Sequence, residues 1–189
     1  MEQFSFSVNN SVAKSGVCSS LMSLYRQKTP VIVCIGTDGV AGDSLGPFVG
    51  TILKQRNIPA YIYGYLDSPI TAYEVPSLSE FLKKTHPDSS VLVIDSAVGK
   101  EEDIGVIKVA DCGLKPGLGA QKDLPRVGNV SIMGVVEKKD KSSLNKLKHT
   151  RLRLIWQMAN IIADGICDYI DYCQNSPSQI SFTKISKAI

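Results

Sequence analysis

The chain has 189 residues, which is the length of one ordinary domain. Hydrophobic residues make up 43% and charged residues 21% of it, a composition that excludes a disordered, collagen-like or coiled-coil protein. The formal net charge of +3 is too small to indicate a nucleic acid or an anionic membrane as partner. The five cysteines form no CxxC pair, which is typical of reduced thiols in a cytoplasmic protein. We therefore expect a single cytoplasmic domain over residues 1–189.

Apolar patterning divides this domain into alternating helices and strands. Apolar residues at helical spacing predict helices over residues 12–26, from 45 onward, 77–84 and 142–173. A capping box of Ser77 and Glu80 opens the third of these helices, and the fourth is expected to bend near Gly165. Short β-branched runs predict strands over residues 31–35, 60–66, 90–94, 104–109 and 129–136.

This order of elements predicts the fold class. Strands that alternate with helices are typical of a three-layer α/β/α sandwich with a mostly parallel sheet, of the phosphorylase/hydrolase-like kind. Within it we expect an N-terminal helix in residues 1–28, a core over about 29–173 and a loosely attached tail over 174–189.

Acidic residues follow two of the predicted strands. Asp38 and Asp43 come after the strand that ends at residue 35, and Asp95 comes after the strand that ends at 94. Ligands of an open α/β sheet bind beyond these strand ends, where two neighbouring carboxylates suit acid–base chemistry on water or a metal whose bound water attacks. Structural roles stay open as alternatives: Asp43 also suits a helix N-cap, Asp95 also suits tying down a loop, and Asp38 beside Gly39 suits a tight turn.

Two glycine-rich loops accompany these carboxylates. The loop at 36–47 lacks the lysine of a P-loop and fails the dinucleotide fingerprint, which leaves phosphate binding by its backbone N–H groups as a minor alternative. The loop at 113–128 has the length of a functional loop. The residues that we expect to bind substrate are Gly36, Asp38, Ser96, Gly117 and Gly119.

The two histidines and the basic stretch at 138–153 give weaker signals of function. Neither His86 nor His149 follows a predicted buried strand, so we expect no zinc site and assign no metal ligand. The basic stretch 138–153 predicts an exposed helix face, with an acidic protein partner as the minority interpretation.

Several motifs resemble a known family. Residues 36–38, 42–47 and 93–97, together with 115–120 and 128–132, resemble the YyaC-like sporulation proteins of spore-forming Firmicutes. That family is similar to the germination protease of spores and, more distantly, to hydrogenase maturation proteases. All are expected to share the three-layer α/β/α fold.

The resemblance implies roles for the two strand-end aspartates. In germination protease an acidic residue three positions before the glycine of a Leu-Gly-Pro turn is catalytic, which matches Asp43 here. Its second catalytic aspartate ends an Ile-Asp strand, which matches Asp95. Hydrogenase maturation proteases hold metal-binding carboxylates at the same strand ends, but their third ligand is a histidine for which this sequence offers no clear equivalent.

The implied function is a peptidase-like hydrolase of sporulating cells. Its two aspartates would activate water against a peptide or spore protein, with the loop 113–128 shaping the substrate groove. The alternative is a non-catalytic relative that binds such a protein with the same cleft. No cofactor is expected, while a divalent metal between Asp43 and Asp95 and the formation of a homo-oligomer stay open.

Overall fold

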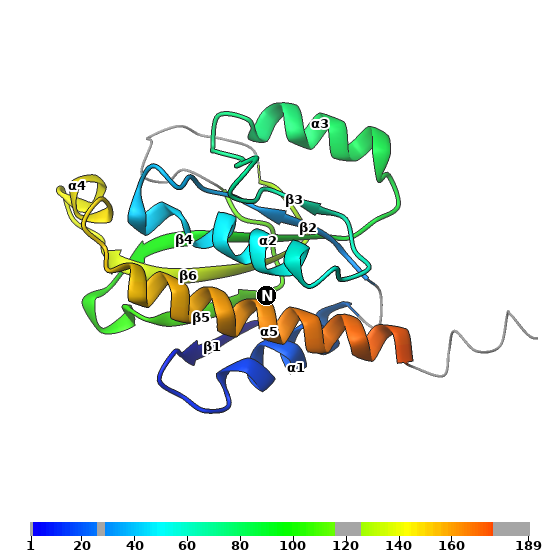
Figure 1. The fold of residues 1–189 in the computed structure, drawn as a ribbon, viewed down its shortest axis with the longest axis horizontal. Coiled ribbons are helices and arrows are strands. Elements are labelled where there is room, and N and C mark those ends of the chain that lie inside the picture. The colour runs from blue at the N-terminus through cyan, green and yellow to red at the C-terminus, as the bar shows by residue number, and fades with distance from the viewer. Residues whose placement is uncertain (1, 26–28, 116–125, 176–189) are drawn as a thin grey trace, which may run out of the picture.

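A six-stranded sheet in the order β1-β5-β6-β4-β2-β3 forms the centre of the molecule (Figure 1). The computed structural model describes residues 2–25, 29–115 and 126–175. Its strands are β1 (Gln3–Ser7), β2 (Val31–Cys34), β3 (Ile62–Tyr63), β4 (Val91–Gly99), β5 (Val106–Ala110) and β6 (Val130–Lys138). Strands β3, β2, β4 and β6 pair in parallel, whereas β5 runs antiparallel to both β6 and β1. The prediction of a mostly parallel sheet is confirmed.

Helices cover both faces of this sheet. They are α1 (Ala13–Tyr25), α2 (Leu45–Gln55), α3 (Val75–Thr85), α4 (Ser143–Leu147) and α5 (Leu152–Asn175), with short 3-10 helices η1 (Ala41–Asp43) and η2 (Glu101–Asp103). A large core lies between one face of the sheet and α1, α2 and α5, and a smaller core lies on the other face under α3 (Figure 1). The three-layer α/β/α architecture is therefore confirmed. No helix within the described ranges is long and apolar enough to cross a bilayer.

Strand β2 shows why the central strands are apolar throughout. Ile32 and Cys34 point into the large core, whereas Val31 and Val33 point into the smaller one. Because successive side chains of a strand alternate between faces, a strand covered on both sides needs an unbroken apolar sequence.

The connections leave β2 and β4 in opposite directions. The chain passes from β2 through α2 to the edge strand β3, whereas from β4 it continues to β5 and β6 on the other side of the sheet. Helices α2 and α3 cover opposite faces. The carboxyl ends of β2 and β4 therefore border a topological switch point, which is where open α/β sheets bind ligands.

The N-terminal segment differs from the prediction. It begins with β1, a strand that was not predicted, before the expected helix α1. The side chains of β1 alternate only between exposed and half-buried positions, so its sequence carries little apolar periodicity. Its partner β5 supplies the hydrogen bonds, with Gln3 opposite Ala110 and Ser7 opposite Val106.

Three other elements differ from the prediction as well. Only Ile62–Tyr63 of the strand expected over 60–66 pairs with β2. The prediction of a capping box at Ser77 is wrong, because α3 begins at Val75. At this helix start the carboxylate of Glu74 instead accepts a 2.9 Å hydrogen bond from the N–H of Thr71. The single helix expected over 142–173 is two helices, and α5 continues through Gly165.

The break between α4 and α5 has a packing cause. The side chain of Thr150 in this turn is buried and reaches Gly42 of η1. A Cβ built at Gly42 would lie 2.7 Å from Thr150 Oγ1 and 2.6 Å from Leu147 Cδ2. The turn thus docks on η1 through the space that the glycine leaves.

Candidate active site

A glycine places Asp43 at the end of β2. Gly36 follows this strand with φ +139°, and a Cβ there would lie only 2.0 Å from the backbone oxygen of Asp43. That oxygen accepts a 3.1 Å hydrogen bond from the N–H of Thr37. The loop therefore folds back on itself because residue 36 has no side chain. Gly36 shapes the site in this way, and a contact between it and a substrate stays a prediction.

The start of α2 packs just as closely on the end of β2. A Cβ at Gly46 would lie 2.1 Å from the backbone oxygen of Ile35. The N-cap of α2 is Ser44, whose hydroxyl donates to the backbone oxygen of Ala41 at 2.6 Å. The capping interpretation of Asp43 is therefore wrong, since Asp43 ends η1 and its carboxylate points to β4 instead.

Asp95 lies inside β4 and not after it, which corrects the prediction. Strand β2 pairs with β4 only as far as Cys34 opposite Ile94, whereas β4 runs on beside β6 to Gly99. Asp95 is thus the first residue of β4 beyond β2. Only 8% of Asp95 is exposed, and it shares a face with Val93, which belongs to the smaller core.

Ser96 connects the two aspartates. Its backbone N–H donates to Asp95 Oδ1 at 2.7 Å, and its hydroxyl donates to Asp43 Oδ1 at a longer 3.4 Å. One residue therefore contacts both carboxyl groups, although 52 positions of sequence separate them. Among the residues of the structure, Asp95 accepts its side-chain hydrogen bond from its neighbour and not from a loop, which argues against the loop-tying interpretation.

Burial and neighbouring charge shift the pKa values of the two carboxyl groups. Burial raises the pKa of Asp43 to about 6, although hydrogen bonds from the Ser96 hydroxyl and the Thr37 N–H favour its charged form. Burial raises the pKa of Asp95 well above its ordinary value, and the nearby charge of Asp43 raises it further. The hydrogen bond from the Ser96 N–H acts in the opposite direction, because it favours the charged form. Asp43 thus loses its proton before Asp95, because the more deeply buried carboxyl group, beside a negative charge, keeps its proton longer. The pair therefore sets Asp43, with a pKa of about 6, beside a carboxyl group whose pKa is raised well above its ordinary value.

The other predicted binding residues are less closely connected to this pair. Asp38 is exposed in a turn, as its turn interpretation predicted. Gly117 and Gly119 lie outside the described residues. At the two ends of that loop, Leu114 and Val127 form a bridge and belong to the smaller core, on the face of the sheet that Asp95 shares.

Sequence reasoning missed two contributors to the site. The N–H of Thr37 holds the loop to Asp43, and Gly42 lets the turn between α4 and α5 approach η1. Backbone hydrogen bonding carries no sequence signal, whereas the glycines of the first loop gave a signal that close packing was needed.

The residues at this site do not form a recognisable metal centre. No group of three or more His, Cys, Asp and Glu side chains that could hold a metal ion occurs in the described part of the chain. His86 ends α3 and His149 lies in the turn between α4 and α5, so neither supplies a third ligand beside Asp43 and Asp95.

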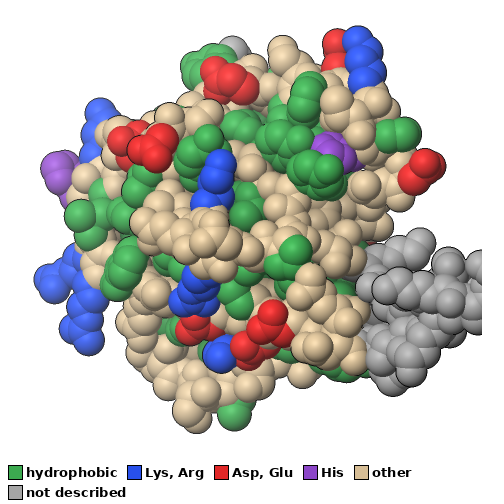
Figure 2. Space-filling model, turned by 45° about the vertical axis from the view of Figure 1, so that its right-hand side comes forward, with side chains coloured by type: hydrophobic (Ala, Val, Ile, Leu, Met, Phe, Trp, Pro, Cys, Tyr) green, Lys and Arg blue, Asp and Glu red, His purple; other side chains and the backbone are tan. Residues whose placement is uncertain are grey.

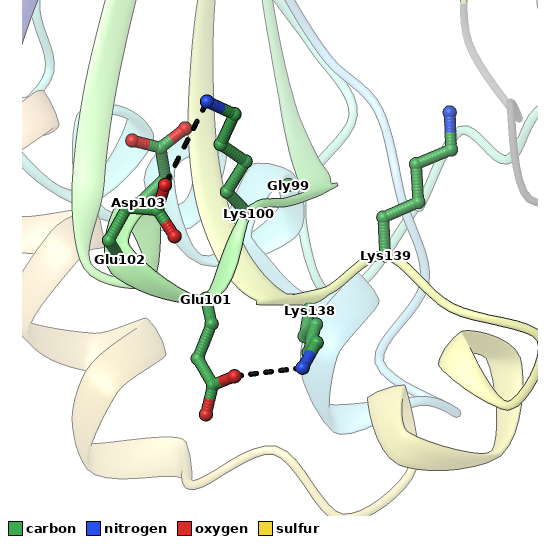
Figure 3. Close-up of a pocket in the computed structure, with 7 residues that line it drawn as sticks. All are labelled: Gly99, Lys100, Glu101, Glu102, Asp103, Lys138 and Lys139. Atoms are coloured by element: carbon green, nitrogen blue, oxygen red, sulfur yellow. Dashed lines mark hydrogen bonds and ion pairs between the residues drawn. The ribbon is translucent and has the colours of Figure 1, made fainter.

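A separate charged cavity of about 590 Å³ lies beyond Asp43 and Asp95, the aspartate dyad, where β4 and β6 end (Figure 3). Lys138 contacts Glu101 at 2.8 Å, and Lys100 contacts Glu102 at 3.8 Å. Neither aspartate of the dyad lines this cavity. Because charged side chains of its lining pair with one another and neither aspartate reaches it, we assign the cavity no role.

The sequence relationships agree with the resemblance seen in the motifs. The chain belongs to the family described as "Protein of unknown function (DUF1256)", which matches residues 6–165. It is similar to the "Uncharacterized protein YyaC" of Bacillus subtilis (strain 168), with 38% identity over 151 residues that cover 79% of this chain and 74% of that relative. The predicted relationship to YyaC-like proteins is therefore confirmed.

A solved structure shows a more remote likeness. The [NiFe] hydrogenase maturation protease HycI from Thermococcus kodakarensis KOD1 matches 75% of this chain and 97% of its own, with a TM-score of 0.40 and 19% sequence identity. The fold class given above rests on the sheet and helices of this chain and not on that likeness.

Proposed function

We propose that this chain is a peptidase-like hydrolase in which Asp43 and Asp95 act together on a water molecule. The observation that carries the proposal is the position of Ser96, whose N–H and hydroxyl contact one carboxyl group each. The pair lies at the switch point of the sheet, where this class of fold binds ligands. Two carboxyl groups with separated pKa values supply the base and the acid that hydrolysis needs.

The different pKa values of the two carboxyl groups assign the base to Asp43 and the acid to Asp95. The charged carboxylate of Asp43 accepts a proton from water as the water oxygen attacks the peptide carbonyl carbon. The protonated Asp95 donates its proton to the carbonyl oxygen, which gives a neutral tetrahedral diol. When the C–N bond breaks, Asp43 passes its proton to the leaving nitrogen and Asp95 recovers one from a diol hydroxyl. Both carboxyl groups then return to their starting states.

The substrate part of the proposal depends on the family resemblance. Because germination protease acts in spores, a peptide or protein of sporulating cells is the expected substrate. Leu114 and Val127, near the ends of the loop 113–128, belong to the smaller core, on the face of the sheet that Asp95 shares, so the loop begins and ends on the side where we expect the substrate.

A non-catalytic protein-binding role is the second candidate. The small exposed fraction of Asp95, 8%, favours it, because a substrate carbonyl has to reach this carboxyl group for the proton transfer. A binding protein on the same fold would need no such access.

Cleavage of a defined peptide mixture tests the two candidates. The purified chain is incubated with peptides from a digested bacterial proteome at several pH values, and new termini are identified by mass spectrometry. We expect cleavage by the natural sequence, loss of it in Asp43→Asn and Asp95→Asn, and full activity in the control Asp88→Asn, whose side chain is exposed in the turn after α3. Equal cleavage by all four proteins would refute the dyad, and binding of peptides without cleavage would favour the second candidate.

A further inference from the structure

Helix α4 and the first turns of α5 present large apolar side chains to solvent. Leu144 and Leu152 are each 57% exposed, and Trp156 is 53% exposed. Leu152 and Trp156 lie one turn apart on α5, so they share a face of that helix. The Trp156 ring contacts Phe48 of α2 edge-on, with 5.8 Å between ring centroids. This contact holds the tryptophan in place while half of it stays open to a partner.

Positive charge accompanies these side chains along the sequence. Residues 141–163 contain five Lys and Arg residues and no Asp or Glu. Lys146 pairs with Asp140, whereas Lys148, Arg151 and Arg153 are exposed and have no carboxylate within ion-pair distance in the described part of the chain. Blue side chains gather at the left-hand edge of Figure 2, on the side where Figure 1 places α4 and the start of α5.

We call this region the basic-apolar surface and define it by six residues. They are Leu144, Lys148, Arg151, Leu152, Arg153 and Trp156. The region differs from an ordinary exposed helix face, because large apolar side chains and unopposed cations occur together. Apolar surface that stays exposed in this way marks a binding site more often than isolated exposed residues do.

The basic-apolar surface is physically connected to the candidate active site. Leu147 and Thr150 occupy the space beside Gly42, and Asp43 is the next residue of η1. A partner on this surface therefore lies next to the loop that carries one of the two aspartates.

We propose that the basic-apolar surface binds an acidic polypeptide segment that carries apolar side chains. Charge complementarity selects the acidic partner, since three unpaired cations attract carboxylates. Leu144, Leu152 and Trp156 select a polypeptide over a nucleic acid, because two of the three are aliphatic and offer no stacking surface to bases. The proposal goes beyond the proposed hydrolase, and it holds whether or not the bound segment is cleaved.

The single tryptophan of the chain gives a direct assay, since it lies within the surface. The probe is a synthetic amphipathic peptide of Glu, Ala and Leu, and the control peptide has Gln in place of every Glu. Titration of the full chain with the probe should change the Trp156 fluorescence in a saturable way. We expect the Gln peptide to bind about tenfold more weakly, and raising the salt from about 0.05 M to about 0.5 M to weaken the probe similarly.

Matched variants assign the binding to this surface. The double variant Arg151→Glu/Arg153→Glu should raise the Kd of the probe by about tenfold or more, and Leu152→Ser should raise it by a smaller factor. The control Lys83→Glu/Lys84→Glu reverses two exposed charges on α3 and should leave the Kd within about twofold. Measurement in the Asp95→Asn background separates binding from cleavage, so a failed hydrolase would leave the outcome unchanged.

Three results would overturn the proposal. The first is equal binding of the Gln and Glu peptides, and the second is an equal effect of the α3 and α5 charge reversals. The third is tighter binding of duplex DNA or of phosphatidylglycerol vesicles than of the acidic peptide, which would assign the surface to a different class of partner.

Discussion

Replacement of Asp43 by Asn should stabilise the protein at neutral pH and leave its stability unchanged in acid. Burial raises the pKa of Asp43 from 3.8 to about 6. The folded protein therefore holds a proton between these values that the unfolded chain has already lost, so stability falls as the pH rises from about 4 to about 6. A difference of roughly two pKa units, at 1.36 kcal/mol each, corresponds to about 3 kcal/mol. Because Asp43 keeps some contact with water, this figure is an upper value.

Urea unfolding at a series of pH values measures this effect. The quantity to compare is the free energy of unfolding of Asp43→Asn minus that of the natural sequence. It should be near zero below about pH 4 and rise to at most about 3 kcal/mol above about pH 6. Asn keeps a side-chain oxygen, so it can still accept the hydrogen bond from Ser96.

Asp38→Asn is the matched control, because Asp38 is exposed in the same loop. A pH dependence that appears in Asp43→Asn and not in this control is assigned to the buried carboxyl group. A flat difference for Asp43→Asn would show that the folded protein does not shift the pKa of this carboxyl group. The buried environment that we assign to the Asp43 carboxyl group would then be refuted.

Three further predictions concern the same site. Asp95→Asn should slow peptide cleavage by about 10²–10⁴-fold, since general acid catalysis contributes on this order; an unchanged rate would remove Asp95 from the mechanism. Ser96→Ala removes a hydroxyl that favours the charged form of Asp43, so the pKa of Asp43, measured by carboxyl ¹³C NMR, should rise, whereas Ser96→Thr should preserve it. A lower value in Ser96→Ala would contradict this contact. Gly36→Ala places a Cβ 2.0 Å from the Asp43 oxygen at φ +139° and should lower the free energy of unfolding by about 3 kcal/mol or more; a loss under about 1 kcal/mol in urea titrations would show that the loop adapts.

The central strands could be predicted because their physical environment is uniform. Residues 31–34 and 91–94 are covered on both faces, so an unbroken apolar run was required there. Strand β1 could not be predicted, since it lies at the edge of the sheet and its stability comes from backbone pairing with β5. The break between α4 and α5 was missed for a similar reason. Apolar spacing continues across it, and the cause is a distant contact between Thr150 and Gly42.

The candidate site was predictable in its residue types but not in its geometry. Asp43 and Asp95 were found because parallel strands end at one edge of a sheet. Asp95 lies within β4 because β6 pairs with β4 beyond the end of β2, and the sequence of β4 alone does not show this. The two contacts of Ser96 depend on how β4 and the loop after β2 are placed beside each other. The sequence alone shows only that Ser96 follows Asp95.

The pairing of β1 has a consequence for how the chain is made. Gln3 lies opposite Ala110, so β1 has to wait for a partner that is synthesised more than a hundred residues later. Closing so long a segment is entropically unfavourable, and contacts of this range slow folding. Until β1 docks, β5 presents an open edge with the sequence VIKVA, which can pair with another chain. Deletion of β1 would leave that edge permanently open and should favour aggregation.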